Sequence, residues 1–293
     1  MSGDARALRR RIEECARAAG GIVGVSVTHL PSGTHLGYNE DQLFPLASVV
    51  KVPILVALVA EARAGRVDLG ERVTLRHADR VAGSGVLQDL DEGLNPTLRD
   101  LAVLMITVSD NTATDLILER VPQARVERVM SEIGLESIRI PMKIRDLLAE
   151  LVDMDAATPG TYEEVRRRLR LSIGSGGRAI VPEQTDRGTP REICRLFELL
   201  ESRAILDPDA CAEILDICGR QKFSDRIPAR LPAGVLTAHK TGGIRGVRND
   251  AGVVYAPTGP HAMALFAREL PDAALASRAL ADLSFAIYER FNQ

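Results

Sequence analysis

Tryptophan is absent from the 293-residue chain, and aromatic residues make up only 3% of it. A protein that holds nucleic acid by stacking its bases needs aromatic platforms, so this composition argues against that function. The formal net charge of -3 and the pI near 6.0 also exclude a strongly basic surface. We therefore expect neither a nucleic-acid partner nor a membrane partner.

Long hydrophobic runs are also missing. No apolar stretch reaches the roughly 18 residues that a transmembrane helix needs. Residues 1–20 are charged and amphipathic, and they lack the apolar middle of a signal peptide. Two alternatives follow: the protein is cytoplasmic, or a leader has been removed from it.

Cysteine is scarce and its spacing is uninformative. The four cysteines form no C-x-x-C pair, and an even count permits disulfides without requiring them. We expect buried thiols, because a free cysteine behaves as a small hydrophobic residue. The histidines outside residue 239 are scattered without the spacing of zinc ligands, so we expect no metal and no cofactor.

Strand-like patterns lie near both ends of the chain. Residues 21–40 and 234–270 alternate like strands, whereas residues 46–204 are mostly helical and a last helix closes the chain. These patterns predict a single domain of the α+β (broadly α/β) class, whose antiparallel sheet is built from both chain ends. The sheet subdomain would cover about 1–45 and 205–293, and the helical subdomain about 46–204.

Lysine is rare, which makes its positions informative. Only Lys51, Lys143, Lys222 and Lys240 occur, against 33 arginines. A buried lysine can lose its proton, whereas an arginine in a protein cannot. A lysine at a suspected site therefore points to proton transfer.

The segment "PLASVVKVPIL" places a hydroxyl and an ammonium group in an apolar run. On a helix, Ser48 and Lys51 share a face, and a lysine with a lowered pKa can take the proton of a serine. The alternative is a capping serine followed by a lysine that extends to solvent. Pro53 lacks an N–H group, which predicts that the helix begins at or near Ser48.

Two further motifs have ordinary structural alternatives. Ser109-Asp110-Asn111 lies between two helical runs, where these residue types commonly cap a helix. Lys240-Thr241-Gly242-Gly243 lies in a predicted strand, where a glycine suggests that another group approaches the backbone closely. The alternative there is a hairpin with a solvated lysine.

Taken together, S-x-x-K, S-D-N and K-T-G in this order are a three-part signature, and the chain resembles the class A serine β-lactamase family over nearly its whole length. The resemblance implies a metal-free monomer that acts on a small amide or ester, most simply by β-lactam hydrolysis, with the active site between the two subdomains. It leaves open a D-alanyl peptidase or esterase, and a penicillin-binding or sensing domain that does not hydrolyse.

The resemblance also implies roles for individual residues. Ser48 would be the acylated nucleophile and Lys51 its proton acceptor or relay, while Ser109 would pass a proton to the leaving nitrogen. Three further residues would bind substrate: Asn111 its amide, and Lys240 and Thr241 its carboxylate. The N–H groups of Ser48 and Gly243 would form the oxyanion hole, and Arg248 would be a second carboxylate ligand or a surface arginine.

One part of the family pattern is missing. The usual E-x-x-L-N motif, whose glutamate activates water, does not occur before the Thr189-Pro190 pair. Within the long stretch 140–188, Glu183 is the first candidate for this base and Glu150 the second; otherwise the acyl-enzyme would be released slowly or by another base. His239 neighbours Lys240 on a strand, so we expect it to face the other side and to serve packing.

Overall fold

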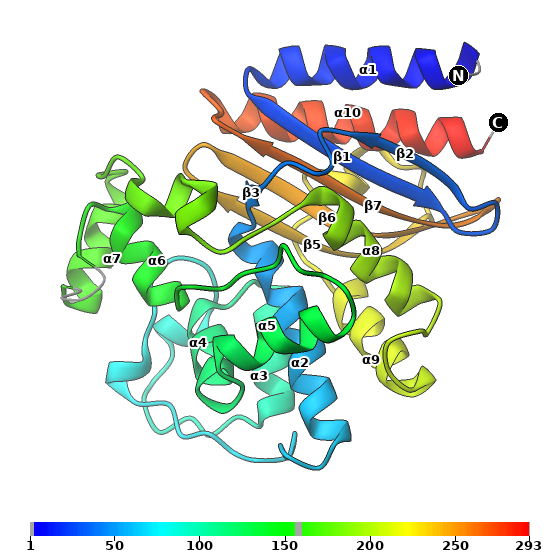
Figure 1. Ribbon diagram of the computed structural model, residues 1–293. Coiled ribbons are helices and arrows are strands. Elements are labelled where there is room, and N and C mark those ends of the chain that lie inside the picture. Colours follow the sequence, from blue (N-terminus) through cyan, green and yellow to red (C-terminus); the bar gives the residue numbers. More distant parts are fainter. Residues whose placement is uncertain (1–2, 156–159, 293) are drawn as a thin grey trace. The chain divides into compact units, whose positions relative to one another are not determined.

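The computed structural model describes residues 3–155 and 160–292, and Figure 1 labels its helices and strands. The α-helices are α1 (Gly3–Ala19), α2 (Lys51–Arg63), α3 (Leu98–Thr107), α4 (Asn111–Arg120), α5 (Gln123–Glu132), α6 (Ile144–Leu151), α7 (Tyr162–Arg170), α8 (Pro190–Glu201), α9 (Pro208–Gly219) and α10 (Ala273–Phe291). The strands are β1 (Ile22–His29), β2 (Thr34–Tyr38), β3 (Phe44–Pro45), β4 (Arg187–Gly188), β5 (Leu236–Ile244), β6 (Val247–Ala256) and β7 (Gly259–Arg268).

The chain divides into two compact units. The sheet unit contains the residues up to Val49 and those from Gly188 onward, and the helical unit contains Val50–Arg187. The first boundary lies close to the expected one near residue 45. The second lies earlier than the expected one near residue 204, because α8 packs against β1, β6 and β7 and so belongs with the sheet.

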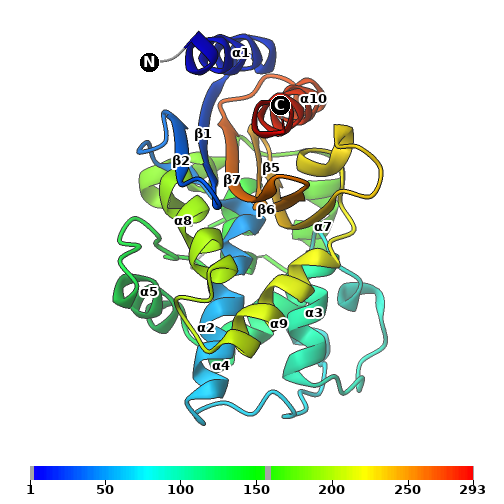
Figure 2. The ribbon, with the colours of Figure 1, turned by 90° about the vertical axis from the view of Figure 1, so that its right-hand side faces the viewer.

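The sheet unit contains a five-stranded antiparallel sheet in the order β2-β1-β7-β6-β5. Helices α1 and α10 pack together on one face, and α8 covers the other (Figures 1 and 2). Alternate residues of β1 and β7 point into the core under α1 and α10, as the strand period of two requires. This confirms the predicted α+β class and the antiparallel sheet built from both chain ends.

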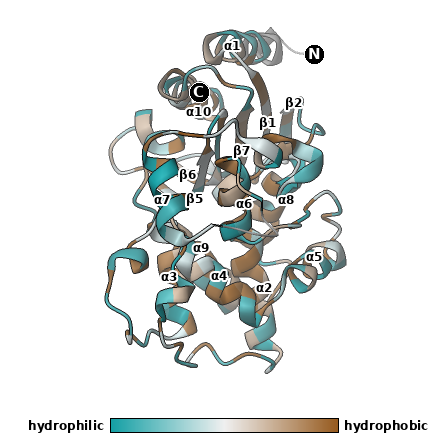
Figure 3. Cartoon of the chain, turned by 90° about the vertical axis from the view of Figure 1, so that its left-hand side faces the viewer, coloured by the Kyte–Doolittle hydropathy of each residue, from teal (hydrophilic) through white to brown (hydrophobic). Residues whose placement is uncertain are grey.

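The helical unit is organised around α2. Its residues are hydrophobic almost all round, as its colouring in Figure 3 shows, and α3, α4 and α5 contact it. A 3-10 turn, η1 (Ala47–Val50), precedes α2, so Pro53 is the third residue of α2. The N–H groups of the first turn have no partner within an α-helix, so a proline is tolerated there. Gly65, with φ of +71°, follows the end of the helix.

Candidate active site

In the sheet unit, Ser48 lies on a short segment that the sheet holds in place. Ser48 is half-buried, and Ala47 before it has the left-handed φ of +46° that non-glycine residues rarely adopt. The fully buried Asn249 donates from Nδ2 to the carbonyls of Pro45 (2.7 Å) and Leu46 (3.1 Å). Asn249, which the sequence did not single out, therefore fixes the backbone that carries Ser48.

Strand β5 approaches this segment closely at Gly242. A Cβ atom on Gly242 would lie 2.6 Å from the Leu46 carbonyl and 3.1 Å from the Ser48 nitrogen, so no side chain fits there. The sequence predicted a close approach at a strand glycine, and the approaching group is the backbone of the Ser48 segment. Glycine at this position thus brings the K-T-G strand beside the N–H group of Ser48.

Asn249→Ala is expected to lower the free energy of unfolding by about 1–3 kcal/mol, because two buried carbonyls lose their donor. Chemical denaturation measures the change. The exposed Asn95→Ala serves as the matched control and should leave the midpoint nearly unchanged. Equal midpoints for both variants would show that Asn249 does not hold the Ser48 segment.

Two arginines lie beside Gly243. Its Cβ position is 3.2 Å from Nη1 of Arg248 and 3.5 Å from Nη2 of Arg226. Arg248 donates to the carbonyls of Ile244 and Val247, and burial together with Arg226 lowers its pKa. Sequence reasoning missed Arg226, which belongs to no motif; only the fold brings it to this strand.

The neighbours Lys240 and His239 have different surroundings. Lys240 is fully buried and donates to the Thr241 carbonyl (2.8 Å). Nδ1 of His239 lies 2.9 Å from Oδ1 of Asp250, whose Oδ2 accepts the N–H of Ile227. His239 therefore forms a buried pair with a carboxylate, and it does more than the packing that the sequence suggested.

In the helical unit, Lys51 is the centre of a polar cluster. Its side chain is fully buried, and Nζ lies 2.7 Å from the Ser109 carbonyl, 3.1 Å from Ser109 Oγ and 2.7 Å from Asn111 Oδ1. The first two motifs thus meet, although 58 residues separate Lys51 from Ser109. Burial lowers the pKa of Lys51 to about 7, against the opposing effect of Asp110 and Asp115, so a large fraction is neutral at neutral pH.

Asp110, the middle residue of S-D-N, stabilises the local backbone. Asp110 caps α4 by accepting the Ala113 N–H, and its other oxygen accepts the N–H groups of Val86 and Leu87. The capping alternative is therefore correct for Asp110, and its cap helps to orient Ser109, which has a φ of +56°, and Asn111. The loop before Leu87 is thereby tied to the Lys51 cluster.

Ser84 is a member of this cluster that the sequence did not reveal. Its Oγ donates to the Ser109 carbonyl (2.7 Å) and lies 3.3 Å from Asn111 Oδ1, so it touches two groups that also bind Lys51. Gly83 stands beside it with a φ of +94°, and its Cβ position would be 2.8 Å from Asn111 Nδ2 and 3.6 Å from Leu148 Cδ1. Leu148 and the Asn111 amide therefore adjoin the same small space.

The two candidate bases for activating water, Glu183 and Glu150, lie in different surroundings. Glu183 is exposed on the 3-10 turn η5 (Pro182–Gln184), and Glu150 on α6 forms an ion pair with Arg178. The assignment of Glu183 or Glu150 stays a prediction.

Asp186, three residues before Thr189, is buried and accepts only the Met142 N–H through Oδ1; Oδ2 has no partner among the described residues. Burial raises the pKa of its carboxyl from 3.8 to about 8. Between about pH 4 and pH 8 the folded protein therefore keeps a proton on Asp186 that the unfolded chain has released. The contribution of this carboxyl to the free energy of unfolding falls by about 1.4 kcal/mol for each pH unit over this range.

We expect Asp186→Asn to remove this slope and to be more stable than the wild type above pH 6. Denaturant midpoints at pH 5, 6, 7 and 8 test the expectation. The exposed Asp209→Asn is the control and should keep the slope of the wild type. Parallel curves for wild type and Asp186→Asn would contradict it.

Residues 3–155 and 160–292 contain no group of three histidine, cysteine, aspartate or glutamate side chains placed to hold a metal ion. Within the same ranges, no helix has both the length and the apolar character needed to cross a bilayer. All four cysteines are buried free thiols, as expected.

Comparison with known proteins identifies the family. The model of the Beta-lactamase enzyme family matches residues 7–291. The chain is 28% identical to the β-lactamase regulatory protein BlaB of Streptomyces cacaoi over 261 residues, which is 80% of each chain. Among solved structures, the β-lactamase of Sphaerobacter thermophilus superposes with a TM-score of 0.81 at 28% identity, covering 97% of both chains.

A variant of PBP-A, solved as its acyl-enzyme complex with penicillin G, superposes with a TM-score of 0.80 at 28% identity, covering 97% of this chain and 96% of that one. The family match spans nearly all of the chain, including all three motifs. The resemblance read from the motifs is confirmed: the chain belongs to the Beta-lactamase enzyme family and is a class A β-lactamase-like serine hydrolase.

Proposed function

We propose that the protein is acylated on Ser48 by β-lactams and releases the acyl group by hydrolysis, more slowly than it forms. The observation that carries this proposal is the buried Lys51 cluster, in which an amine with a pKa of about 7 contacts Ser109 and Asn111. An amine of that pKa is partly neutral at pH 7 and can act as a base. Ser48 lies three residues before it in the chain.

In the proposed acylation, neutral Lys51 accepts the proton of Ser48 as its oxygen attacks the lactam carbonyl carbon. The resulting oxyanion is bound by the N–H groups of Ser48 and Gly243, the first of which lies near Gly242. The C–N bond then breaks, and Ser109 delivers a proton to the nitrogen while taking one from the Lys51 ammonium. Acyl transfer to Ser48 is thus balanced by protonation of the leaving amine.

Four further residues support binding of an anionic substrate. Thr241 and Lys240 belong to the K-T-G strand, and we propose that they bind the substrate carboxylate. Arg248 was the predicted second ligand; Arg226 has an equal claim, because both guanidinium groups adjoin Gly243.

Intact-protein mass spectrometry with a chromogenic cephalosporin tests the proposal. The expected result is an adduct that accumulates within the first turnover and decays slowly, accompanied by slow colour formation. Ser48→Ala should give no adduct, with circular dichroism showing that it is folded. An adduct that persists in folded Ser48→Ala would rule out Ser48 as the nucleophile, and no adduct in the wild type would turn attention to esters and D-alanyl peptides.

A second candidate function is a penicillin-binding or sensing protein that never releases the acyl group. One observation favours it: the residue that shares the space beside the Asn111 amide is Leu148, which cannot activate water. The likeness to a protein named as a β-lactamase regulator agrees with this alternative. An adduct that stays unchanged for hours would select this function over hydrolysis.

A further inference from the structure

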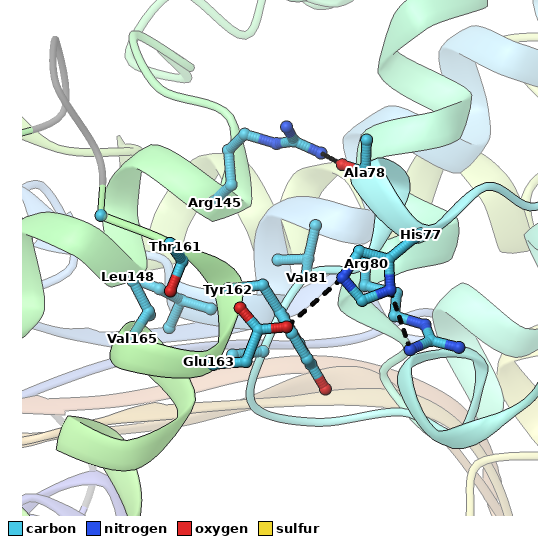
Figure 4. Close-up of a pocket in the computed structure, with 12 residues that line it drawn as sticks. His77, Ala78, Arg80, Val81, Arg145, Leu148, Thr161, Tyr162, Glu163 and Val165 are labelled. Carbon is cyan, nitrogen blue, oxygen red and sulfur yellow. Dashed lines mark hydrogen bonds and ion pairs between the residues drawn. The ribbon is translucent and has the colours of Figure 1, made fainter.

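The helical unit contains a cavity of about 350 Å³ between α6, α7 and the loop that carries His77. We call it the α6–α7 cavity; Val81, Leu148, Tyr162 and Val165 form its walls, and Arg80 and Arg145 line it as well (Figure 4). Lys51, Ser109 and Asn111 are not among its lining residues. The cavity is therefore distinct from the Lys51 cluster, although Leu148 adjoins both.

The walls are apolar. Val81, Leu148 and Val165 are each less than a tenth exposed, and Ala78 and Ala82 add further hydrocarbon surface. A volume of this size lies at the lower end of the range of small-molecule sites, which combine apolar walls with a few polar groups. A ligand here would have a compact hydrophobic body.

The polar groups of the lining carry an excess of positive charge. Arg145 donates from Nη2 to the Ala78 carbonyl, a contact visible at the top of Figure 4, and its Nε lies 3.4 Å from Asp115. Arg80 donates to the Leu90 carbonyl, and its buried Nε has no hydrogen-bond partner among the described residues. Two guanidinium groups thus line the cavity, and they donate to the carbonyls of Ala78 and Leu90, which carry no net charge.

The acidic side chains near the cavity are either screened by solvent or already hydrogen-bonded. Glu163 faces His77 at 3.3 Å, and both side chains are more than half exposed, so solvent screens their charges. Asp115 stands behind Arg145, but it is buried and already accepts the N–H groups of Ile144 and Arg145. A third acid, the buried Asp79, also interacts electrostatically with Arg145, and it forms an ion pair with Arg76.

We propose that the α6–α7 cavity is a binding site for a small carboxylate with an apolar body, whose carboxylate meets Arg145. The hydrophobic part packs against Val81, Leu148 and Val165. A carboxylate can accept bidentate hydrogen bonds from a guanidinium group, which an amide or an alcohol cannot do. This site is independent of the proposed acylation of Ser48.

Methyl-labelled NMR spectroscopy of the full chain tests the proposal with 3-phenylpropionate as the probe. The matched probes are 3-phenylpropionamide, which has the same shape without charge, and 3-phenylpropylamine, which carries the opposite charge. The variants are Arg145→Gln, Val165→Trp to fill the cavity, and Arg170→Gln as a control on α7 that does not line it.

We expect saturable shifts of the Val81, Leu148 and Val165 methyl groups with the carboxylate, and binding at least about tenfold weaker with the amide and the amine. Arg145→Gln should weaken the carboxylate about tenfold and leave the amide unchanged, while Arg170→Gln should change neither. Equal binding of all three probes, or shifts confined to residues around Arg226 and Arg248, would overturn the proposal. Because the probe comparison uses the wild type, the result stands even if Val165→Trp fails to fold.

Discussion

Lys51→Met is expected to lower the second-order rate of Ser48 acylation by about 10²–10⁴-fold, the usual contribution of a positioned general base. Methionine has a similar length and remains apolar, so it can occupy the buried position without a charge. Stopped-flow acylation with a chromogenic cephalosporin measures the loss. Lys222→Met, at an exposed lysine, is the matched control and should acylate at the rate of the wild type.

The same substitution should stabilise the fold. The pKa of Lys51 falls from 10.5 to about 7 on folding, so the unfolded chain holds a proton between these values that the folded protein lacks. Burying Lys51 therefore lowers the free energy of unfolding by roughly 5 kcal/mol below about pH 7. This destabilisation disappears as pH rises to about 10. Lost hydrogen bonds to Ser109 and Asn111 offset part of this gain.

We therefore expect Lys51→Met to be more stable than wild type at pH 6–7, and the difference to shrink toward pH 10. The acylation rate of the wild type should rise with pH through about 7, as Lys51 loses its proton. Denaturation and rate profiles over this range test both statements. An acylation rate that does not change between pH 6 and pH 8 would exclude Lys51 as the base.

The three motifs could be read from the sequence because each is local and because lysine is rare. S-x-x-K, S-D-N and K-T-G named Lys51, Ser109, Asn111 and Lys240, and the structure places the first three in one cluster. The antiparallel sheet followed from the period-two patterns at both chain ends.

The sequence did not reveal the residues whose contacts depend on the folded chain. Asn249, Arg226 and Ser84 lie in no motif, and their partners are backbone carbonyls and side chains distant in the sequence. Nothing in a pattern of residue types predicts such pairings, because they depend on how strands and loops meet. The sequence also could not assign α8 to the sheet unit, because an amphipathic helix has the same pattern whether it packs on a sheet or on other helices.

The second large effect concerns release of the acyl group, and Leu148→Glu is expected to accelerate it by about 10²-fold or more. Leu148 Cδ1 and the Asn111 amide adjoin the same space beside Gly83, so a carboxylate at residue 148 would lie near a hydrogen-bond donor and near the Lys51 ammonium. A carboxylate there can take a proton from water as the water attacks the ester of Ser48. Leucine offers no such group.

Decay of the adduct in intact-mass spectra measures this acceleration after excess β-lactam is removed. Leu148→Gln has nearly the same shape without the charge, so it should decay at the rate of the wild type. Glu183→Gln and Glu150→Gln complete the series, because either one would slow decay if it already supplies the base. Fast release by the wild type that is lost in Glu183→Gln or Glu150→Gln would contradict the expectation, since the base would then come from the stretch 140–188 as the sequence suggested, and residue 148 would have no part in it.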